Sequence, residues 1–275
     1  MTDEIALEGG VAHPGAVVRI GDTVRRPAGA HTASVHALLS HLRSVGFDGA
    51  PAPLGMDKWG REVLSFVPGD VPVPPYPPWA LRDESLASVA RLLHRFHDAV
   101  QGFDPGGGTW SAELADEDGG EIVVHHDVCP ENVVFRDGEA VALLDFDFAG
   151  PGRPLGDVAS TISMWAPLRD PRTISPDRAA LDPFRRARVF CDAYGVSSEG
   201  RAELIPMWPR MRRQGIAFVR RHVDAGEPAF VEMWEGAGGE EGERRNLAWI
   251  EENLERLRQA LLDDPPPGRE SIDPM

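Results

Sequence analysis

Residues 122–147 read IVVHHDVCPENVVFRDGEAVALLDFD, and this stretch decides the fold. Two short β-branched and apolar runs, 122–124 and 133–135, enclose a polar loop. The segment 136–139, Arg-Asp-Gly-Glu, then leads into a third apolar run at 141–144. An Asp-Gly pair between two such runs is typical of a tight β-hairpin. The pattern therefore predicts a strand, a loop and a hairpin in immediate succession.

Three polar residues stand where these predicted strands meet. Asp127 and Asn132 lie in the loop five positions apart, and Asp145 follows the last strand thirteen positions after Asn132. Phosphoryl transfer needs an Asp that orients or accepts the hydroxyl proton, an Asn that reaches a magnesium ion, and a second Asp that binds magnesium at the phosphates. The spacing resembles the protein-kinase signature, with Asp147 in place of the DFG glycine. We expect the strands to bring the first three side chains to one edge.

These residue types also have simpler interpretations. Asp and Asn are common in turns, where their side chains bind backbone amides, so Asp127 and Asn132 alone would not define a site. The addition of Asp145 at its spacing favours the phosphoryl-transfer interpretation. Asp147 is consistent both with a second carboxylate near the substrate and with a solvated acid. Cys129 lies inside the loop, but no adjacent base argues for a nucleophile.

The block resembles the aminoglycoside phosphotransferase family, kinase-like enzymes that phosphorylate small molecules and whose loop usually reads HGDxxxxN before a D-F/W-D/E motif. His126 stands here in place of the usual glycine. The resemblance extends over about residues 5–262 and includes the segments 61–69, 93–97 and 156–159.

This resemblance implies an α+β, protein-kinase-like two-lobe fold, with a small β-rich N-lobe, a larger and mainly helical C-lobe, and a nucleotide between them. It implies ATP or GTP and Mg²⁺ as cofactors. His125 and Asp157 would support the loop structurally. The site residues that it implies are Asp127 as the catalytic base, Asn132 and Asp145 as metal ligands, and Asp147 and Glu131 on the substrate side.

The rest of the chain divides into a β-rich beginning and a helical remainder. Two short β-branched runs within 17–26 are joined by a Gly-Asp pair, and the segment 35–45 has helical spacing. The expected order is three strands, a helix and two strands. A proline-dense connector at 71–78 marks a boundary, and helical patterns then dominate. We expect a nucleotide-binding lobe at 1–69 with a hinge at about 65–69, a catalytic and substrate lobe at 70–264, and a flexible tail at 265–275.

Nucleotide binding is predicted on the small lobe, although its usual markers are weak. The stretch 9–15 only approximates a glycine-rich loop, and no Lys stands on the third strand. Strand alternation places Val24 and Arg26 on one face and Arg25 on the other. If Val24 faces the base, Arg26 faces the phosphates and replaces the Lys, the alternative being a solvated edge arginine. The helix offers His36 where an acid is expected, so no ion pair is predicted. The hinge would add Ser65, Phe66 and Val67 to the nucleotide site.

Composition excludes several classes of function. The 275 residues include 28 Lys and Arg against 44 Asp and Glu, a net charge of −16. A chain this acidic lacks the basic surface that binds nucleic acid or an anionic membrane. It also lacks an apolar run of the roughly 18 residues that span a bilayer. Two cysteines without CxxC spacing, and an acidic start without signal-peptide features, make a cytoplasmic location the expectation.

The sequence thus predicts ATP-dependent O-phosphorylation of a small hydroxylated molecule. An acidic C-terminal half favours a cationic, aminoglycoside-like acceptor, although the segment 236–243 is equally consistent with a solvated loop. Two alternatives stay open: a kinase-like nucleotide- or metabolite-binding protein with weak catalysis, and a metabolite kinase of the choline or homoserine type. The acidic residues of the helical lobe on which this expectation rests include Glu227, Glu232, Glu235, Glu240, Glu241 and Glu243.

Overall fold

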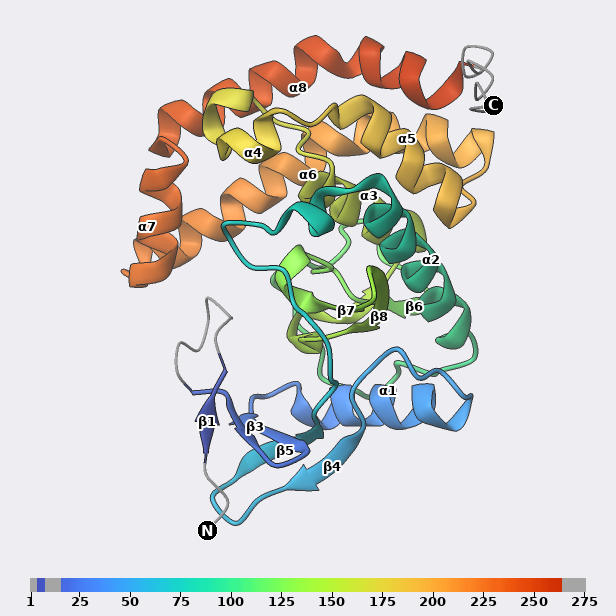
Figure 1. The fold of residues 1–275 in the computed structure, drawn as a ribbon, viewed down its shortest axis with the longest axis vertical. Coiled ribbons are helices and arrows are strands. Elements are labelled where there is room, and N and C mark those ends of the chain that lie inside the picture. The colour runs from blue at the N-terminus through green and yellow to red at the C-terminus, as the bar shows by residue number, and fades with distance from the viewer. Residues whose placement is uncertain (1–3, 8–15, 264–275) are drawn as a thin grey trace, which may run out of the picture.

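The computed structural model describes residues 4–7 and 16–263. The glycine-containing stretch 9–15 and the tail predicted at 265–275 lie outside the described residues. The chain has the predicted α+β, protein-kinase-like fold, with a small sheet lobe in the lower part of Figure 1 and a larger helical lobe above it.

The small lobe is an antiparallel five-stranded sheet with one helix beside it. Its strand order is β1-β2-β3-β5-β4, so the chain returns to the sheet after the helix. The predicted order of three strands, a helix and two strands is confirmed. The elements are β1 (Ile5–Ala6), β2 (Val18–Ile20), β3 (Thr23–Pro27), α1 (Thr32–Ser44), β4 (Pro53–Met56) and β5 (Arg61–Ser65).

The register between β3 and β5 positions the charged residues of this lobe. Arg26 lies directly opposite Glu62, and Arg25 lies opposite Val63. Since directly opposed residues share one face of a sheet, Arg26 and Glu62 face the same way. Helix α1 buries the predicted apolar stripe, including Leu38 and Leu42, against the hydrophobic core.

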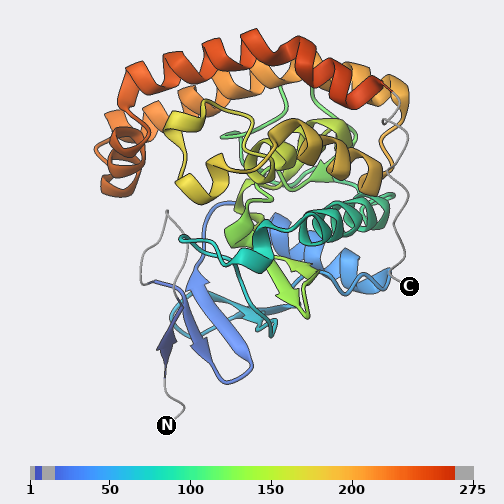
Figure 2. The ribbon, with the colours of Figure 1, turned by 45° about the horizontal axis from the view of Figure 1, so that its top comes forward.

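The large lobe is built mainly of helices. Helix α8 crosses above α5 and α6 and contacts both, as Figure 2 shows. The helices predicted around 86–100, 184–194 and 247–261 are confirmed as α2, α5 and α8. Its α-helices are α2 (Asp83–Ala99), α3 (Pro154–Trp165), α4 (Pro176–Ala179), α5 (Pro183–Tyr194), α6 (Ser198–Asp224), α7 (Pro228–Gly236) and α8 (Gly239–Leu262). The short 3₁₀ turns of the described chain are η1 (Pro78–Leu81), η2 (Pro130–Asn132), η3 (Phe146–Phe148) and η4 (Pro171–Thr173).

The loop interpretation of 236–243 is wrong for most of that segment. Helix α7 ends at Gly236, and α8 begins three residues later at Gly239. The reason is local: Gly238 and Gly239 both have positive φ, which turns the chain sharply and lets a second helix start at once.

Two pairs of short strands carry the block from which the fold was predicted. Strand β6 (Ile122–Val124) pairs with β9 (Gly150–Gly152), and β7 (Val133–Arg136) pairs with β8 (Glu139–Leu143). Asp137 and Gly138, at the β7–β8 turn, have φ of 54° and 82°. Two successive positive φ angles are characteristic of the type I′ hairpin turn, which confirms the predicted hairpin.

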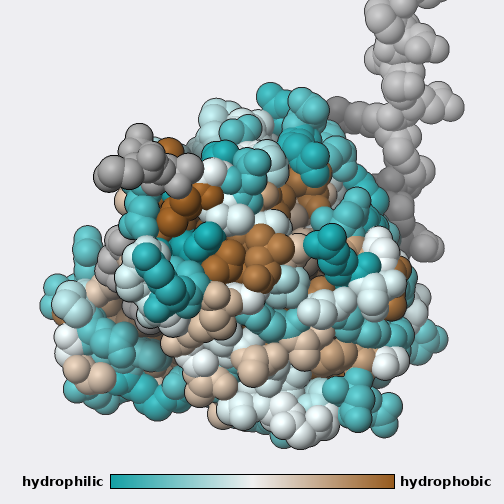
Figure 3. Space-filling view, turned by 90° about the horizontal axis from the view of Figure 1, so that it is seen from below, coloured by the Kyte–Doolittle hydropathy of each residue, from teal (hydrophilic) through white to brown (hydrophobic). Residues whose placement is uncertain are grey.

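The surface at the small-lobe end is mixed in character. Figure 3, which views the molecule from below, shows separate hydrophobic patches among hydrophilic residues. Large exposed apolar side chains of this lobe include Leu54, Met56 and Trp59. Among the described residues, no helix has the length and apolar character required to cross a membrane.

Candidate active site

Asp157 holds the backbone of the loop between β6 and β7. It lies in the first turn of α3, is fully buried, and accepts hydrogen bonds from the backbone N–H groups of His125 and His126, both at 2.9 Å. His97 contacts the same carboxylate at 3.1 Å. Burial alone would raise the pKa of Asp157, but the hydrogen bond and charge of His97 bring it down to about 2. The carboxylate therefore supports the loop, as the sequence predicts.

The two histidines of the loop fill different positions. His125 is buried, its Nε2 contacts the carbonyl oxygen of Leu144 at 2.9 Å, and its ring packs on Phe146 at 4.6 Å. His126 has φ of 65°, in the left-handed region that glycine favours. A histidine therefore stands where the family usually has glycine, and its backbone lies in a region that glycine adopts without strain. Burial lowers the pKa of both histidines.

Asp127 and Asn132 face each other across the loop. The Asn132 amide nitrogen donates to Oδ2 and to the backbone carbonyl of Asp127, both at 2.9 Å. The backbone carbonyl of Asn132 accepts a hydrogen bond from the Leu144 N–H at 2.8 Å, which joins the loop to the residue before Asp145. Burial, followed by the charges of Asp145 and Glu131, raises the pKa of Asp127 to about 7. A carboxyl with this pKa is suited to exchange a proton near neutral pH.

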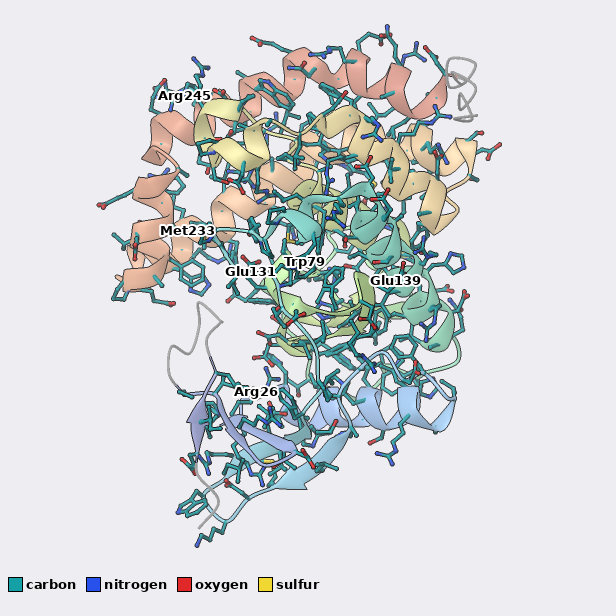
Figure 4. The ribbon with its side chains drawn as sticks, viewed as in Figure 1. Arg26, Trp79, Glu131, Glu139, Met233 and Arg245 are labelled. Atoms are coloured by element: carbon teal, nitrogen blue, oxygen red, sulfur yellow. The ribbon has the colours of Figure 1, made fainter. Side chains whose placement is uncertain are left out.

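Arg26 joins the two lobes. From β3 it binds Glu62, and it reaches Oδ1 of Asp145 at 2.8 Å and Oδ1 of Asp147 at 2.6 Å. Figure 4 shows Arg26 on the side of the small lobe that faces the helical lobe. Burial alone would lower the pKa of Arg26, but the three carboxylates raise it above its ordinary value. Arg26 is therefore a paired residue between the lobes, and a solvated edge arginine is excluded.

The expectation that Arg26 has no acidic partner is wrong. Glu62, which is 1% exposed, supplies the ion pair from the neighbouring strand rather than from the helix. His36 of α1 contacts the other oxygen of Glu62 at 2.9 Å. His36 on α1 therefore positions Glu62, and the register between β3 and β5 places Glu62 opposite Arg26.

Asp145 and Asp147 lie on the large-lobe side of this ion-pair cluster. Asp145 has φ of 57°, in the left-handed region, and lies two residues after β8 ends at Leu143. Burial and the adjacent charge of Asp145 raise the pKa of Asp147, which Arg26 partly offsets. Because Arg26 binds it, Asp147 is not simply a solvated acid.

The remaining predicted site residues belong to the small lobe, to the segment that follows β5, and to the loop before β7. Val24 pairs with Leu64 in the β3–β5 ladder. Ser65 ends β5, and its hydroxyl accepts from the Ala52 N–H at 2.8 Å. The Arg19 guanidinium lies 3.7 Å from the centre of the Phe66 ring. The last two predicted residues are Val67, half-buried in the connector, and Glu131, which accepts a hydrogen bond from the Tyr76 hydroxyl at 2.8 Å.

The oxygen donors at this site fit a magnesium ion. Asn132 uses its nitrogen for Asp127, so its Oδ1 remains available, and Asp145 adds a carboxylate. These are the ligands that Mg²⁺ prefers, completed by water and phosphate oxygens. No group of three His, Cys, Asp or Glu in the described part of the chain forms a metal site by itself. The donor set therefore matches a metal shared with phosphates rather than a closed protein cage.

A cavity of about 290 Å³ opens beside Asp127 on the side of the large lobe. Helices α3, α6, α7 and α8 and the segment after α3 form its walls. In Figure 4, Met233 of α7, one of the lining residues, lies on the same side of the molecule as Glu131 and above Arg26. The position of this cavity, at the carboxyl of Asp127, suits an acceptor molecule.

The glutamates that motivated a cationic acceptor mostly lie away from this cavity. Only Glu243 lies in the wall of this cavity, and it is bound to Arg212. Glu227 instead contacts His222 at 2.8 Å, and Glu240 contacts Arg220 at 2.7 Å. The acidic residues of α7 and α8 mostly occupy outer faces, because the inner faces of these helices pack on α6.

Sequence reasoning missed three residues that the structure brings to the site. Glu62, Arg169 and Arg212 had no local motif around them. Opposed positions in adjacent strands are a signal that could have found Glu62. Arg169 and Arg212 come together only through the packing of α6 beside α3.

Comparison with known proteins gives the family. Residues 109–190 match the model of the phosphotransferase enzyme family, and this segment contains Asp127, Asn132 and Asp145. The chain belongs to this family. The trifolitoxin immunity protein of Rhizobium leguminosarum bv. trifolii is 33% identical over 277 residues, a match that covers 95% of this chain and 100% of that protein.

Solved structures of similar fold include a choline kinase and an aminoglycoside phosphotransferase. A choline kinase from Cryptosporidium parvum matches with a TM-score of 0.58 at 10% identity, covering 95% of this chain and 92% of that one. The GDP complex of aminoglycoside 2′-phosphotransferase-IIIa matches with a TM-score of 0.57 at 13% identity, covering 92% and 93%. At these identities the likeness is one of fold.

Proposed function

We propose that this phosphotransferase transfers the γ-phosphate of ATP or GTP to a hydroxyl of a small molecule, with Mg²⁺ as its cofactor. The observation that carries the proposal is the convergence of Asp127, Asn132, Asp145 and Arg26 between the lobes. A carboxyl of raised pKa, metal-binding oxygens and a guanidinium are the three parts that phosphoryl transfer needs.

Asp127 orients the acceptor hydroxyl and receives its proton. As the oxygen of the hydroxyl bonds to the γ-phosphorus, the bond from that phosphorus to the β-phosphate oxygen breaks, and the nucleoside diphosphate leaves. Asn132 keeps the carboxyl in position through its two hydrogen bonds. Asn132 and Asp145 would hold Mg²⁺, which when bound would supply positive charge against the phosphate oxygens.

Arg26 exchanges partners in this proposal. In the structure its guanidinium neutralises Asp145 and Asp147, while Glu62 anchors it to the sheet. An arriving triphosphate offers Arg26 oxygens that it can bind in a fork, which frees Asp145 for the metal. Val24 and the hinge residues Ser65, Phe66 and Val67 contact the base and ribose.

The similarity to the trifolitoxin immunity protein suggests trifolitoxin as one acceptor. An immunity protein protects against a toxin, and phosphorylation of a toxin hydroxyl would be such a protection. Release of nucleoside diphosphate should be measured with trifolitoxin, aminoglycosides, a macrolide, choline and homoserine as acceptors, with ATP and with GTP. We expect turnover with one acceptor class, lost in Asp127→Asn and retained in Asp48→Asn, a change at an exposed aspartate of the small lobe.

Nucleotide binding separates this function from the binding-protein alternative. Tight binding of ATP and Mg²⁺ with no acceptor-dependent release from any member of the panel would contradict the proposed transfer. The presence of the Arg26–Glu62 ion pair removes the sequence argument that suggested weak catalysis.

A further inference from the structure

The cavity beside Asp127 has a mainly apolar and aromatic wall. Trp208 and Phe218 of α6 and Trp234 of α7 line it, together with Met164 of α3 and Met233 of α7. Aromatic and methionine side chains bind apolar surfaces of varied shape. The wall is therefore suited to an acceptor with an apolar or aromatic body.

The cavity contains a positive charge that the described residues leave unpaired. Its charged lining residues are Asp127, Arg169, Arg212 and Glu243. Arg212 and Glu243 bind each other, although Nε of Arg212 is buried without a hydrogen-bond partner. Within residues 4–7 and 16–263, the side chain of Arg169 makes no hydrogen bond and no ion pair. A partly buried guanidinium without an acid is rare, because desolvation of a charge is costly unless a partner replaces the water.

The surroundings of Arg169 add to this cost. Burial, together with the positive charges of Arg212 and Arg178, lowers the pKa of Arg169 to about 10. Arg178 itself binds the Met164 carbonyl and lies 5.3 Å from the centre of the Tyr76 ring. Of the two acids that line the cavity, Glu243 is bound to Arg212 and Asp127 to Asn132, and neither forms an ion pair with Arg169.

We propose that the acceptor carries an anionic group of the carboxylate type, which Arg169 binds, on an apolar or aromatic body that lies against α6 and α7. This inference rests on the proposed function and names the class of its substrate. A planar guanidinium pairs with a carboxylate through two parallel hydrogen bonds. The anionic group would then anchor the acceptor, and its hydroxyl would lie at Asp127. The structure thus favours the opposite charge from the one expected from composition.

Three probes with the same indole body test the charge preference: N-acetyltryptophan, N-acetyltryptophanamide and tryptamine, which at this pH are anionic, neutral and cationic. Binding to the full chain should be measured by calorimetry at pH 7.5 without nucleotide. We expect the anion to bind about tenfold more tightly than the neutral probe, as one charge-assisted hydrogen-bonded pair provides, and the cation to bind most weakly.

Substitution assigns the preference to one residue. Arg169→Gln should remove the tenfold difference between anion and neutral probe, and Arg169→Lys should keep most of it. Arg43→Gln, at an exposed arginine of α1, is the matched control and should leave the difference unchanged. Arg169→Gln should also leave the thermal midpoint unchanged or raise it, since it removes an unpaired charge.

Three results would overturn the inference: equal binding of anion and neutral probe, tighter binding of the cation, or an unchanged preference in Arg169→Gln. A lower thermal midpoint in Arg169→Gln would assign the residue a structural role instead. None of these measurements uses nucleotide or turnover, so failure of the charge preference is distinct from failure of phosphoryl transfer, which the acceptor panel reports.

Discussion

The two sides of the Asp127 carboxyl differ in how their arginines are paired. On the small-lobe side, Arg26 binds Glu62, Asp145 and Asp147. On the large-lobe side, Arg169 has no acidic partner among the residues that the structure describes. On the small-lobe side three carboxylates surround one guanidinium, whereas on the large-lobe side the guanidinium of Arg169 lies in a mainly apolar cavity.

This difference separates stability from binding. Removing Arg26 takes the guanidinium partner from the buried Glu62 and leaves it the contact with His36, so the folded state loses stability as well as a nucleotide contact. Removing Arg169 leaves no partner behind within the described chain. We therefore expect changes on the small-lobe side to affect both folding and nucleotide binding, and changes at Arg169 to affect acceptor binding alone.

The largest effect is expected at Asp127, where the two sides meet. Asp127→Ala should lower kcat by about a hundredfold to ten-thousandfold, the usual contribution of a positioned general base. Nucleotide affinity should change by less than about threefold, because phosphate and metal contacts hold the nucleotide. Steady-state kinetics and calorimetry with ATP and Mg²⁺ measure the two quantities. Near-normal turnover would exclude the assigned role.

Asp145→Ala should affect metal and nucleotide binding on the small-lobe side of Asp127. Loss of a metal ligand should lower the rate by about a hundredfold and weaken the nucleotide in the presence of Mg²⁺, since metal contacts supply several kcal/mol. The dependence of rate on Mg²⁺ concentration is the measurement. An unchanged dependence would place the metal elsewhere. Asp137→Ala, in the exposed hairpin turn, is the control.

Two adjacent arginines sharpen the comparison within the small lobe. Arg26→Gln should weaken ATP binding by about tenfold, since it removes a charge-assisted contact. It should also reduce the free energy of unfolding by about 1 to 3 kcal/mol, because the buried Glu62 loses its guanidinium partner. Arg25→Gln should change neither quantity, because Arg25 faces away and reaches Asp57 only at 3.9 Å. Weaker ATP binding in Arg25→Gln alone would show that the opposite face binds phosphate.

The smallest effect concerns stability and pH. The raised pKa of Asp127 means that the folded protein holds a proton which the unfolded chain has released, between about pH 4 and pH 7. The carboxylate therefore destabilises the fold increasingly as pH rises through that window. Asp127→Asn should be more stable than the unchanged protein by about 1 to 3 kcal/mol above pH 7, and equal to it near pH 4.

Urea unfolding at both pH values measures this difference. A stabilisation that is the same at both values would show that the carboxyl keeps its ordinary pKa.

Local signals were strong enough to predict the loop and the hairpin. Asp127, Asn132 and Asp145 lie within a short stretch whose turn residues and strand runs follow from neighbouring positions. The predicted support by Asp157 also held, because a buried acid at a helix start is suited to bind backbone N–H groups. The two-lobe fold followed from the resemblance that this block carries.

The sequence by itself thus determined the kinase-like fold and the phosphoryl-transfer block, because these depend on contacts between residues close in the chain or on a recognisable spacing. Only the tertiary structure decided the charges around them. Glu62 reaches Arg26 through strand register, and Arg169 enters the acceptor cavity through the packing of α3 beside α6. Composition counts acidic residues but does not place them. A chain with a net charge of −16 therefore has a cavity in which Arg169 has no acidic partner among the described residues.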